Sequence, residues 1–232
     1  MREIFIIGDI HGHLEKLSKL IEIIKPDAEE IVLVGDLIDR GPNSIGVLEY
    51  AINNNLTVIR GNHEEIMKEA LLDESKCSMD LWMDSGGKTT LNEYKNHKNG
   101  NNLLIKHLEY INKLPYYKIF RSYDYRQHRR LIVSHAPICD LLKGHSPNKL
   151  NQDLFLWNRK IPKIKTPFFN VFGHNIVSEF VKNKSGGVKV DKDLIYMNTL
   201  IDKDVGYAAI DSDVENFKLT AIGFPSMRIV QV

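Results

Sequence analysis

Side chains of the types that bind metal ions recur at the ends of apolar runs along the sequence. They are Asp9, His11, Asp36, Asn62, His135 and His174. Carboxylate and amide oxygens together with imidazole nitrogens suit borderline or hard divalent cations such as manganese, iron or zinc. No thiolate is among them, which argues against a structural zinc knuckle. One cation rarely needs so many ligands, whereas two cations about 3.5–4 Å apart can share a bridging carboxylate. Asp36 lies between the two ligand sets and is the natural bridge.

The elements that must position these side chains follow a repeating pattern. Apolar runs at residues 4–7, 31–34 and 57–59 each end in a polar loop that leads into a helical pattern. In residues 13–24, for example, apolar side chains recur every three or four positions, which indicates one buried helix face. Alternation of strand and helix predicts parallel β-α-β connections, in which functional groups gather at the carboxyl ends of the strands. The candidate ligands should therefore meet at one edge of a sheet.

The rest of the pattern predicts an α/β fold in a single domain, residues 1–232. Residues from about 64 to 117 contain helical stretches and few β-branched runs, which indicates a helical insertion. Strand character returns at residues 130–134 and 168–172, each leading into a histidine, and again at 206–210 and 217–222. A mixed sheet is therefore expected after the first half of the chain.

Composition excludes several classes of function. Lys and Arg number 31 and Asp and Glu number 30, so the formal charge of +1 gives no overall attraction to nucleic acid or anionic membranes. The two cysteines, Cys77 and Cys139, lack metal-ligand or redox-motif spacing. The apolar run at residues 4–7 is too short for a signal peptide or a membrane span. We therefore expect a cytoplasmic protein; the sequence does not specify its oligomeric state.

Five ordered motifs resemble one protein family. They are GDIHG at residues 8–12, GDLIDRG at 35–41, RGNHE at 60–64, SHA at 134–136 and GH at 173–174. The set is similar to the calcineurin-like metallophosphoesterases and, more narrowly, to their phosphoprotein phosphatase branch. Trp82, Thr90 and the LWNR segment at 156–159 resemble bacterial and bacteriophage-lambda-type serine/threonine phosphatases; bacterial diadenosine tetraphosphatases share the core motifs. The resemblance implies a β-sandwich of two mixed sheets flanked by helices in αββα order, with the helical insertion.

The resemblance also implies which residues hold two divalent metal ions. Asp9 and His11 would hold the first metal, Asp36 would bridge, and Asn62, His135 and His174 would hold the second. Manganese is the expected metal, with iron, zinc or nickel as alternatives.

The resemblance assigns the chemical step to five further residues. His63 would act as the general acid beside the leaving group, with Asp39 hydrogen-bonded to its far nitrogen so that the protonated ring is favoured. Phosphate oxygens would be held through paired hydrogen bonds by Arg40, Arg60 and Arg159. A hydroxide bridging the metals would attack phosphorus directly, without a covalent phosphoenzyme.

Three functions compete on these residues. The first is hydrolysis of phosphate monoesters, above all of phosphoserine or phosphothreonine in proteins. The second keeps the chemistry but cleaves dinucleoside polyphosphates, as a symmetrical bis(5'-nucleosyl)-tetraphosphatase does. The third is an inactive phosphopeptide-binding scaffold, which the complete ligand set argues against.

One stretch departs from the family pattern. Residues 210–213 read Ile-Asp-Ser-Asp, so Asp213 stands where the family commonly has glycine. The departure does not touch the expected ligands, but it leaves the shape of that turn open.

Overall fold

Two five-stranded sheets form the centre of the computed structural model, which describes residues 3–72, 76–123, 128–178 and 199–232. The first sheet has the order β10 (Arg228–Gln231), β9 (Thr220–Phe224), β1 (Glu3–Ile7), β2 (Ala28–Leu33) and β3 (Thr57–Val58). The second has the order β4 (Tyr117–Tyr123), β5 (Arg130–Ser134), β6 (Phe168–Phe172), β8 (Tyr207–Ala209) and β7 (Leu200–Asp202). β1, β2 and β3 are parallel, as are β5, β6 and β8, whereas β9, β10, β4 and β7 pair antiparallel. Both sheets are therefore mixed, as expected.

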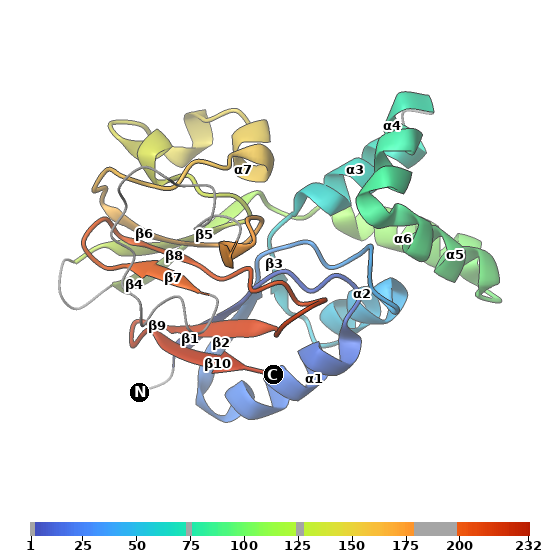
Figure 1. Ribbon diagram of the computed structural model, residues 1–232, viewed down its shortest axis with the longest axis horizontal. Helices are drawn as coiled ribbons and strands as arrows, with labels where there is room; N and C mark the ends of the chain where they lie inside the picture. Colours follow the sequence, from blue (N-terminus) through green and yellow to red (C-terminus); the bar gives the residue numbers. More distant parts are fainter. Residues whose placement is uncertain (1–2, 73–75, 124–127, 179–198) are drawn as a thin grey trace.

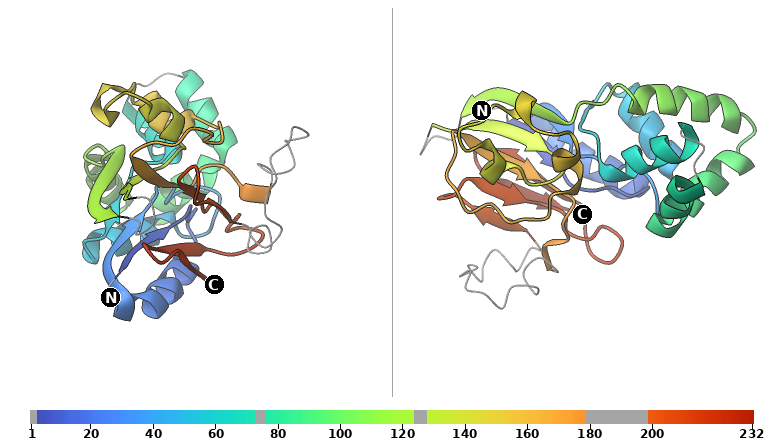
Figure 2. Two further views of the ribbon diagram at one scale, coloured as in Figure 1. Left: turned by 90° about the vertical axis from the view of Figure 1, so that its left-hand side faces the viewer. Right: turned by 90° about the horizontal axis from the view of Figure 1, so that it is seen from above.

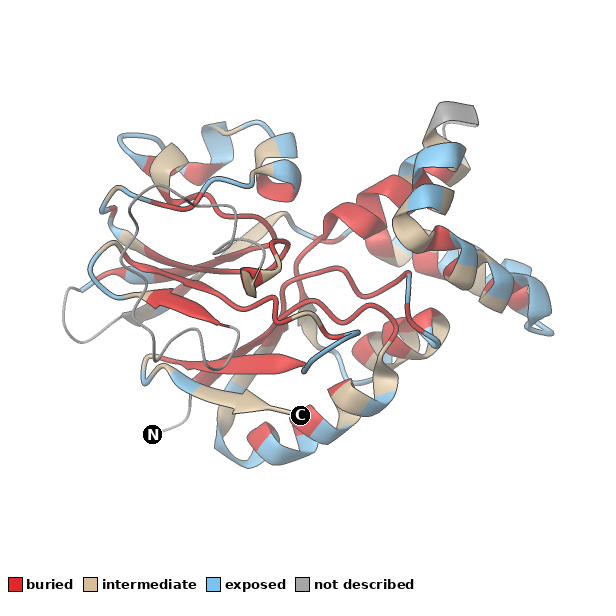
Figure 3. Ribbon diagram, viewed as in Figure 1, coloured by how far each residue is buried: buried red, intermediate tan, exposed pale blue. Residues whose placement is uncertain are grey.

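The two sheets pack face to face, and helices cover their outer faces (Figure 1). Ile6 of the first sheet lies in one buried apolar cluster with Leu131 and Val171 of the second. The outer face of the first sheet packs against α1 (Leu14–Ile24) and α2 (Ser44–Asn53), and that of the second against α7 (Asp153–Trp157). Strands are largely buried and the outward helix faces exposed (Figure 3). This is the expected αββα sandwich. None of the helices in the described ranges is long and apolar enough to cross a membrane.

A helical arm leaves the sandwich after β3 and returns to it at β4 (Figures 1 and 2). It comprises α3 (Asn62–Leu72), α4 (Lys76–Trp82), a π-helical turn (Met83–Gly87), α5 (Lys88–Asn96) and α6 (Gly100–Ile111). The arm corresponds to the insertion expected at about residues 64–117, with shifted boundaries. Because α3 begins at Asn62, this candidate ligand belongs to the first turn of the arm, whereas Tyr117 already belongs to β4.

Hydrogen bonds anchor the arm to α2 at two points. Glu93 on α5 accepts the backbone N–H of Ser44 at 2.8 Å and that of the following residue at 2.9 Å, which satisfies free donors at the start of α2. The buried His107 ring on α6 lies between the Tyr94 hydroxyl and the Glu49 carboxylate of α2, each 2.6 Å away. The arm is therefore tied to the helical layer that covers the first sheet.

The backbone comes unusually close to itself where β2 leads into the loop of Asp36. Gly35 has φ +105°, and a Cβ at this position would lie 2.5 Å from the nitrogen of Gly61 and 2.9 Å from the carbonyl oxygen of Ile59. Only glycine fits both the backbone angle and this contact.

We predict that Gly35→Ala lowers the free energy of unfolding by about 2–4 kcal/mol, because left-handed strain adds to a clash with backbone atoms. Gly144→Ala is the matched control. Gly144 also has a positive φ, +74°, but no atom lies within 4 Å of its Cβ position. A loss of about 1 kcal/mol is expected there. Urea unfolding measures both losses, and equal losses would refute the role of the close contact.

Candidate metal centre

The six predicted ligands converge at one end of the sandwich. Asp9 and His11 follow β1, Asp36 follows β2, Asn62 opens α3, His135 follows β5 and His174 follows β6. All six are buried. All but His135 line a cavity of about 210 Å³, whose other lining residues are Arg40, His63, Arg159, Ile176 and Asp211. Parallel strands that end at a common edge thus bring residues from distant parts of the chain together, as the sequence pattern predicts.

Asp36 lies at the centre of this cluster. Its Oδ2 is 3.7 Å from Nε2 of His11 and 3.8 Å from Nε2 of His63, and its Oδ1 is 3.4 Å from Nε2 of His135. Asp36 belongs to two groups of three donors in which all donor atoms lie within 4.8 Å of one another, one with His11 and His63, the other with Asp9 and His135. Asp36 is thus the donor common to both groups, and its role as a bridge between two cations stays a prediction.

The remaining ligands surround the amide of Asn62. Its Oδ1 is 2.8 Å from Nε2 of His135 and 2.9 Å from Nδ1 of His174. The backbone N–H of His174 donates to both carboxylate oxygens of Asp9, at 3.2 and 3.0 Å. Nε2 of His174 is buried without a hydrogen-bond partner. An unpartnered buried nitrogen among other donors is what a cation site requires.

Burial sets the protonation of these donors. It lowers the pKa of His11 to about 3 and that of His174 to about 2, and it lowers the pKa of His135 as well. Burial, and then the charges of Asp211 and Asp36, raise the pKa of Asp9 well above its usual range. A neutral imidazole can offer a nitrogen lone pair to a cation, and closely spaced carboxylates are stabilised when a cation lies between them. The donor set therefore fits divalent cations.

Several residues of the site have a left-handed backbone. The φ values are +42° at His11, +49° at Asp36, +71° at Asp39, +64° at Arg40 and +64° at His174. Each such conformation costs a non-glycine residue about 1–3 kcal/mol and persists only where its surroundings hold it. At Gly173 a Cβ would lie 1.8 Å from Oδ1 of Asp9, so the two loops meet without room for a side chain. Neighbouring loops therefore impose the conformations that point these side chains at the cavity.

The predicted pair of His63 and Asp39 is present. Nδ1 of His63 lies 2.8 Å from Oδ2 of Asp39. The arm holds the Asp39 carboxylate in turn, because the Trp82 indole donates to both of its oxygens at 3.1 Å and the Thr90 hydroxyl donates to Oδ1 at 2.7 Å. Burial alone would lower the pKa of His63, but the charges of Asp36 and Asp39 and the Asp39 hydrogen bond outweigh it and raise this pKa. The ring is oriented with Nε2 toward Asp36.

Two of the three predicted phosphate-binding arginines line the cavity. Arg40 places one terminal nitrogen 3.2 Å from Nε2 of His11 and the other 3.1 Å from Nε2 of His63. Arg159 is exposed on the opposite loop and donates to Oδ1 of Asn175 at 3.3 Å. Both guanidinium groups are therefore available at the cavity.

The structure does not bring Arg60 to the cavity. Its guanidinium is buried and donates to Oε2 of Glu65 at 2.8 Å, to the Tyr116 hydroxyl at 2.9 Å and to the carbonyl of Asn112 at 2.8 Å. These partners draw the side chain toward the base of the arm. The placement differs from the expected role in phosphate binding, because contact with phosphate would require these bonds to break.

Two residues of the site carry no role in the sequence interpretation. Glu64 is fully buried and its carboxylate accepts three backbone N–H groups, from Asp36 and Gly61 at 2.9 Å and from Leu37 at 2.8 Å. Asp211 lines the cavity and is 6% exposed. Glu64 belongs to the RGNHE motif, and Asp211 follows an apolar strand pattern. These positions in the sequence were the signals that could have identified both residues.

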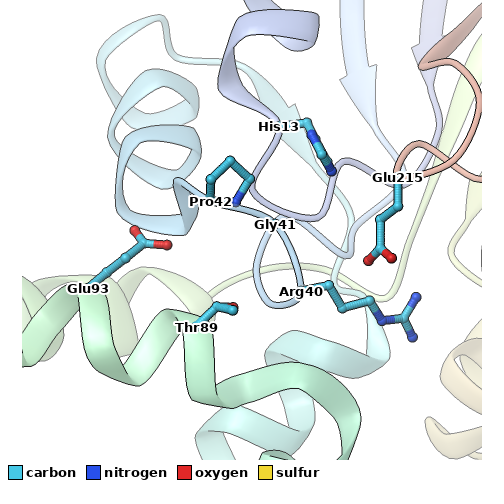
Figure 4. A pocket seen from close by; sticks show the side chains of 7 residues that line it. All are labelled: His13, Arg40, Gly41, Pro42, Thr89, Glu93 and Glu215. Atoms are coloured by element: carbon cyan, nitrogen blue, oxygen red, sulfur yellow. The ribbon is translucent and has the colours of Figure 1, made fainter.

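A second cavity of about 470 Å³ adjoins the first and shares Arg40 with it. Figure 4 shows Thr89 and Glu93 of α5 on one side of this space, with His13, Arg40 and Glu215 on the other. The loop residues Gly41 and Pro42 complete the lining. Figure 4 shows the Glu215 side chain near Arg40, whereas the Glu93 carboxylate, which accepts N–H groups at the start of α2, points away from it.

Fold and site together define a metallophosphoesterase. The model of the calcineurin-like phosphoesterase family matches residues 3–200, and the chain belongs to this family of metal-dependent phosphoester hydrolases.

Curated relatives and solved structures agree with the family assignment. The chain is 38% identical over 88 residues to serine/threonine-protein phosphatase 1 of Salmonella typhimurium, and 35% identical over 88 residues to serine/threonine-protein phosphatase 2 of Escherichia coli. Each match covers 37% of this chain and 39% of the relative. A symmetrical bis(5'-nucleosyl)-tetraphosphatase of Salmonella paratyphi B is 38% identical over 64 residues, 26% of this chain and 23% of the relative.

A solved structure, provisionally named a diadenosine tetraphosphatase, superposes with a TM-score of 0.64 at 19% identity, covering 100% of this chain and 93% of the other. At that identity the likeness concerns the fold alone. The curated relatives are matched over much less than their full length, so they do not decide between phosphoprotein and dinucleotide as substrate.

The different placements of Arg60 and Arg159 predict different consequences of mutation. Arg60→Met should lower the free energy of unfolding by about 2 kcal/mol, because charged hydrogen bonds to Glu65 and its neighbours are lost. It should leave KM for para-nitrophenyl phosphate unchanged. Arg159→Met should leave stability unchanged and raise that KM by about tenfold. Urea unfolding and steady-state kinetics measure the two effects. A stable Arg60 variant with a raised KM would return Arg60 to the phosphate site.

Proposed function

We propose that this protein is a binuclear-metal phosphoesterase that hydrolyses phosphate monoesters, acting on phosphoserine and phosphothreonine in proteins in the manner of the lambda-type phosphatases. One observation carries the proposal: the buried donor cluster around Asp36 shares its cavity with the His63–Asp39 pair and with Arg40. The reaction is direct attack of water on phosphorus. It needs no covalent intermediate on the protein.

The donor residues divide into two sets around Asp36. Asp9 and His11 with Asp36 would hold one cation, and Asn62, His135 and His174 with Asp36 would hold the other. When bound, two divalent cations would neutralise charge on the phosphoryl group and lower the pKa of water toward neutrality. The mixed oxygen and nitrogen donors suit manganese, with iron, zinc or nickel as alternatives.

His63 is the residue that we assign to proton delivery. Asp39 accepts the hydrogen bond from its Nδ1, which leaves Nε2 facing the cavity, 3.8 Å from Oδ2 of Asp36 and 3.1 Å from a terminal nitrogen of Arg40. In this structure Arg40 donates to Nε2, so Nε2 can carry a proton for the oxygen of the leaving alcohol once Arg40 turns to the phosphate; the Asp39 hydrogen bond, which raises the pKa of His63, supports that protonated form. His63 donates the proton, and Trp82 and Thr90 keep its partner Asp39 in place.

Arg40 and Arg159 are the phosphate-binding groups in this proposal. Both line the cavity from opposite loops, and their fork-shaped guanidinium groups match the geometry of phosphate oxygens. Phosphoryl transfer requires mainly positioning and neutralisation of charge, which two arginines and two cations supply.

The charge of the second cavity supports a phosphopeptide as substrate. Glu215 lines this space near Arg40, so a peptide that places a basic side chain there would be attracted. A polyphosphate chain would be repelled by the same carboxylate.

Trp157 supports the alternative activity, symmetrical cleavage of dinucleoside polyphosphates. Its side chain is 41% exposed and its ring centroid lies 6.4 Å from that of His174. An exposed indole beside the metal site could stack on a nucleobase. We rank this second, because it rests on one exposed ring beside the site.

A direct comparison of substrates tests the proposal. With Mn²⁺ present, we expect phosphate release from a phosphothreonine peptide flanked by arginine, and no ADP from diadenosine tetraphosphate. Colorimetric phosphate detection and chromatography measure the two products. ADP formation that disappears in Trp157→Ala would assign the alternative activity instead. Failure to hydrolyse even para-nitrophenyl phosphate at any pH from mildly acidic to alkaline would point to an inactive binding scaffold.

Removal of the proposed general acid should separate chemistry from metal binding. His63→Asn should lower turnover of a phosphopeptide by about 10²-fold, because the leaving group loses its proton donor. The manganese content should not change, since the assigned ligands remain. His145→Asn, at an exposed histidine outside the cavity, is the control and should behave as wild type. A parallel loss of bound manganese in His63→Asn would instead make His63 a ligand.

A further inference from the structure

The two proposed cation sites are unequal in donors. Asn62, His135 and His174 accompany the shared Asp36 at one site, whereas only Asp9 and His11 accompany it at the other. The first site is therefore one protein donor short of the second. A further oxygen close to Asp9 and directed at the same cavity would remove this difference.

Asp211 is the candidate for such a donor, because it lines the same cavity as Asp9. It follows β8 at the end of the second sheet, lines the cavity and is 6% exposed. Its carbonyl oxygen accepts the N–H of Val177 at 3.0 Å, and its Oδ1 accepts the N–H of Asp213 at 3.1 Å. No described residue forms a hydrogen bond with its other carboxylate oxygen, Oδ2. The side chain is thus held by one oxygen while the second has no partner from the described chain.

Backbone packing puts Asp211 beside Asp9. A Cβ on Gly8 would lie only 2.5 Å from the carbonyl oxygen of Ile210, so the chain just after β1 and the chain just after β8 are in direct contact. Asp9 follows Gly8 and Asp211 follows Ile210, so the two aspartates come from neighbouring segments. Two adjacent buried carboxylates without a bound cation between them are costly.

We propose that Asp211 is an additional donor of the first cation site and that its Oδ2 binds the cation held by Asp9 and His11, directly or through one water molecule. This inference rests on the proposed metal centre and extends it. It predicts that the first site depends on Asp211 and that the second site does not.

The competing explanation is that Asp211 only shapes the turn that follows it. An aspartate oxygen that accepts the N–H two residues later is a common turn-forming contact. Asn and Ser at position 211 keep such an acceptor but remove the charge. Asp213, in the same turn, accepts from Asn216 and does not line the cavity, so Asp213→Asn is a matched control.

Manganese binding to the metal-free full-length protein tests the proposal by isothermal titration calorimetry. Wild type should bind two ions. Asp211→Asn and Asp211→Ser should each weaken one of the two sites by about tenfold or more, while the other site and Asp213→Asn keep wild-type affinity. Thermal unfolding without metal should show both Asp211 variants at least as stable as wild type, because a buried charge is removed.

Other outcomes separate a failure of the Asp211 inference from a failure of the proposed metal centre. If both Asp211 variants bind two ions with wild-type affinity, or if Asp213→Asn loses affinity equally, Asp211 only shapes the turn and this inference fails. If Asp211→Asn is less stable than wild type, the manganese affinity of Asp211→Ser tests the inference: a weakened site supports it, and wild-type affinity refutes it. If wild type binds no manganese, the proposed metal centre itself fails.

Discussion

The carboxylate of Glu64 joins two loops that leave neighbouring parallel strands, and the geometry of the site depends on this interaction. Oε2 accepts the N–H groups of Asp36 and Gly61, and Oε1 accepts that of Leu37. Burial, and then the charge of Asp36, raise the pKa of Glu64 to about 7, while hydrogen bonds from Leu37 and Gly61 oppose the rise. Because these backbone donors directly adjoin Asp36 and Asn62, one buried side chain sets the distance between the central carboxylate and the ligands beyond it.

Concentrated negative charge is the second constraint on this region. Asp9, Asp36 and Asp211 surround one cavity, and Arg40 supplies only part of the compensating positive charge. Buried carboxylates must be paired, hydrogen-bonded or bound to cations. Asp39 is satisfied in a different way, because Trp82 and Thr90 donate to it and it binds His63. The same chemical group therefore serves as a candidate cation ligand at three positions and as an orienting partner at the fourth.

The helical arm contributes both to the second cavity and to the support of the proposed general acid. It supplies Trp82 and Thr90, which hold the partner of His63, and also Glu93, which caps α2 and lines the second cavity. One group of helices thus positions the proposed general acid and forms a wall beside Arg40. A change in this arm would therefore affect both the His63–Asp39 pair and the wall of the second cavity.

The sequence alone indicated the candidate donor positions and the parallel connections of the first three strands. Apolar runs that end at Asp9, Asp36 and Asn62 carry this information locally, because alternating strands and helices fold into parallel units whose ends meet at one edge. Strands β4, β7 and β10 were not predicted, since they are edge strands or short, with weak apolar patterns. Only the tertiary structure decided that Arg60 bonds to the base of the arm and that Asp211 reaches the cavity. Arg60 bonds to Tyr116 and Asn112, and the segment of Asp211 packs against Gly8; these partners are distant in the chain, so packing and not a local pattern sets them.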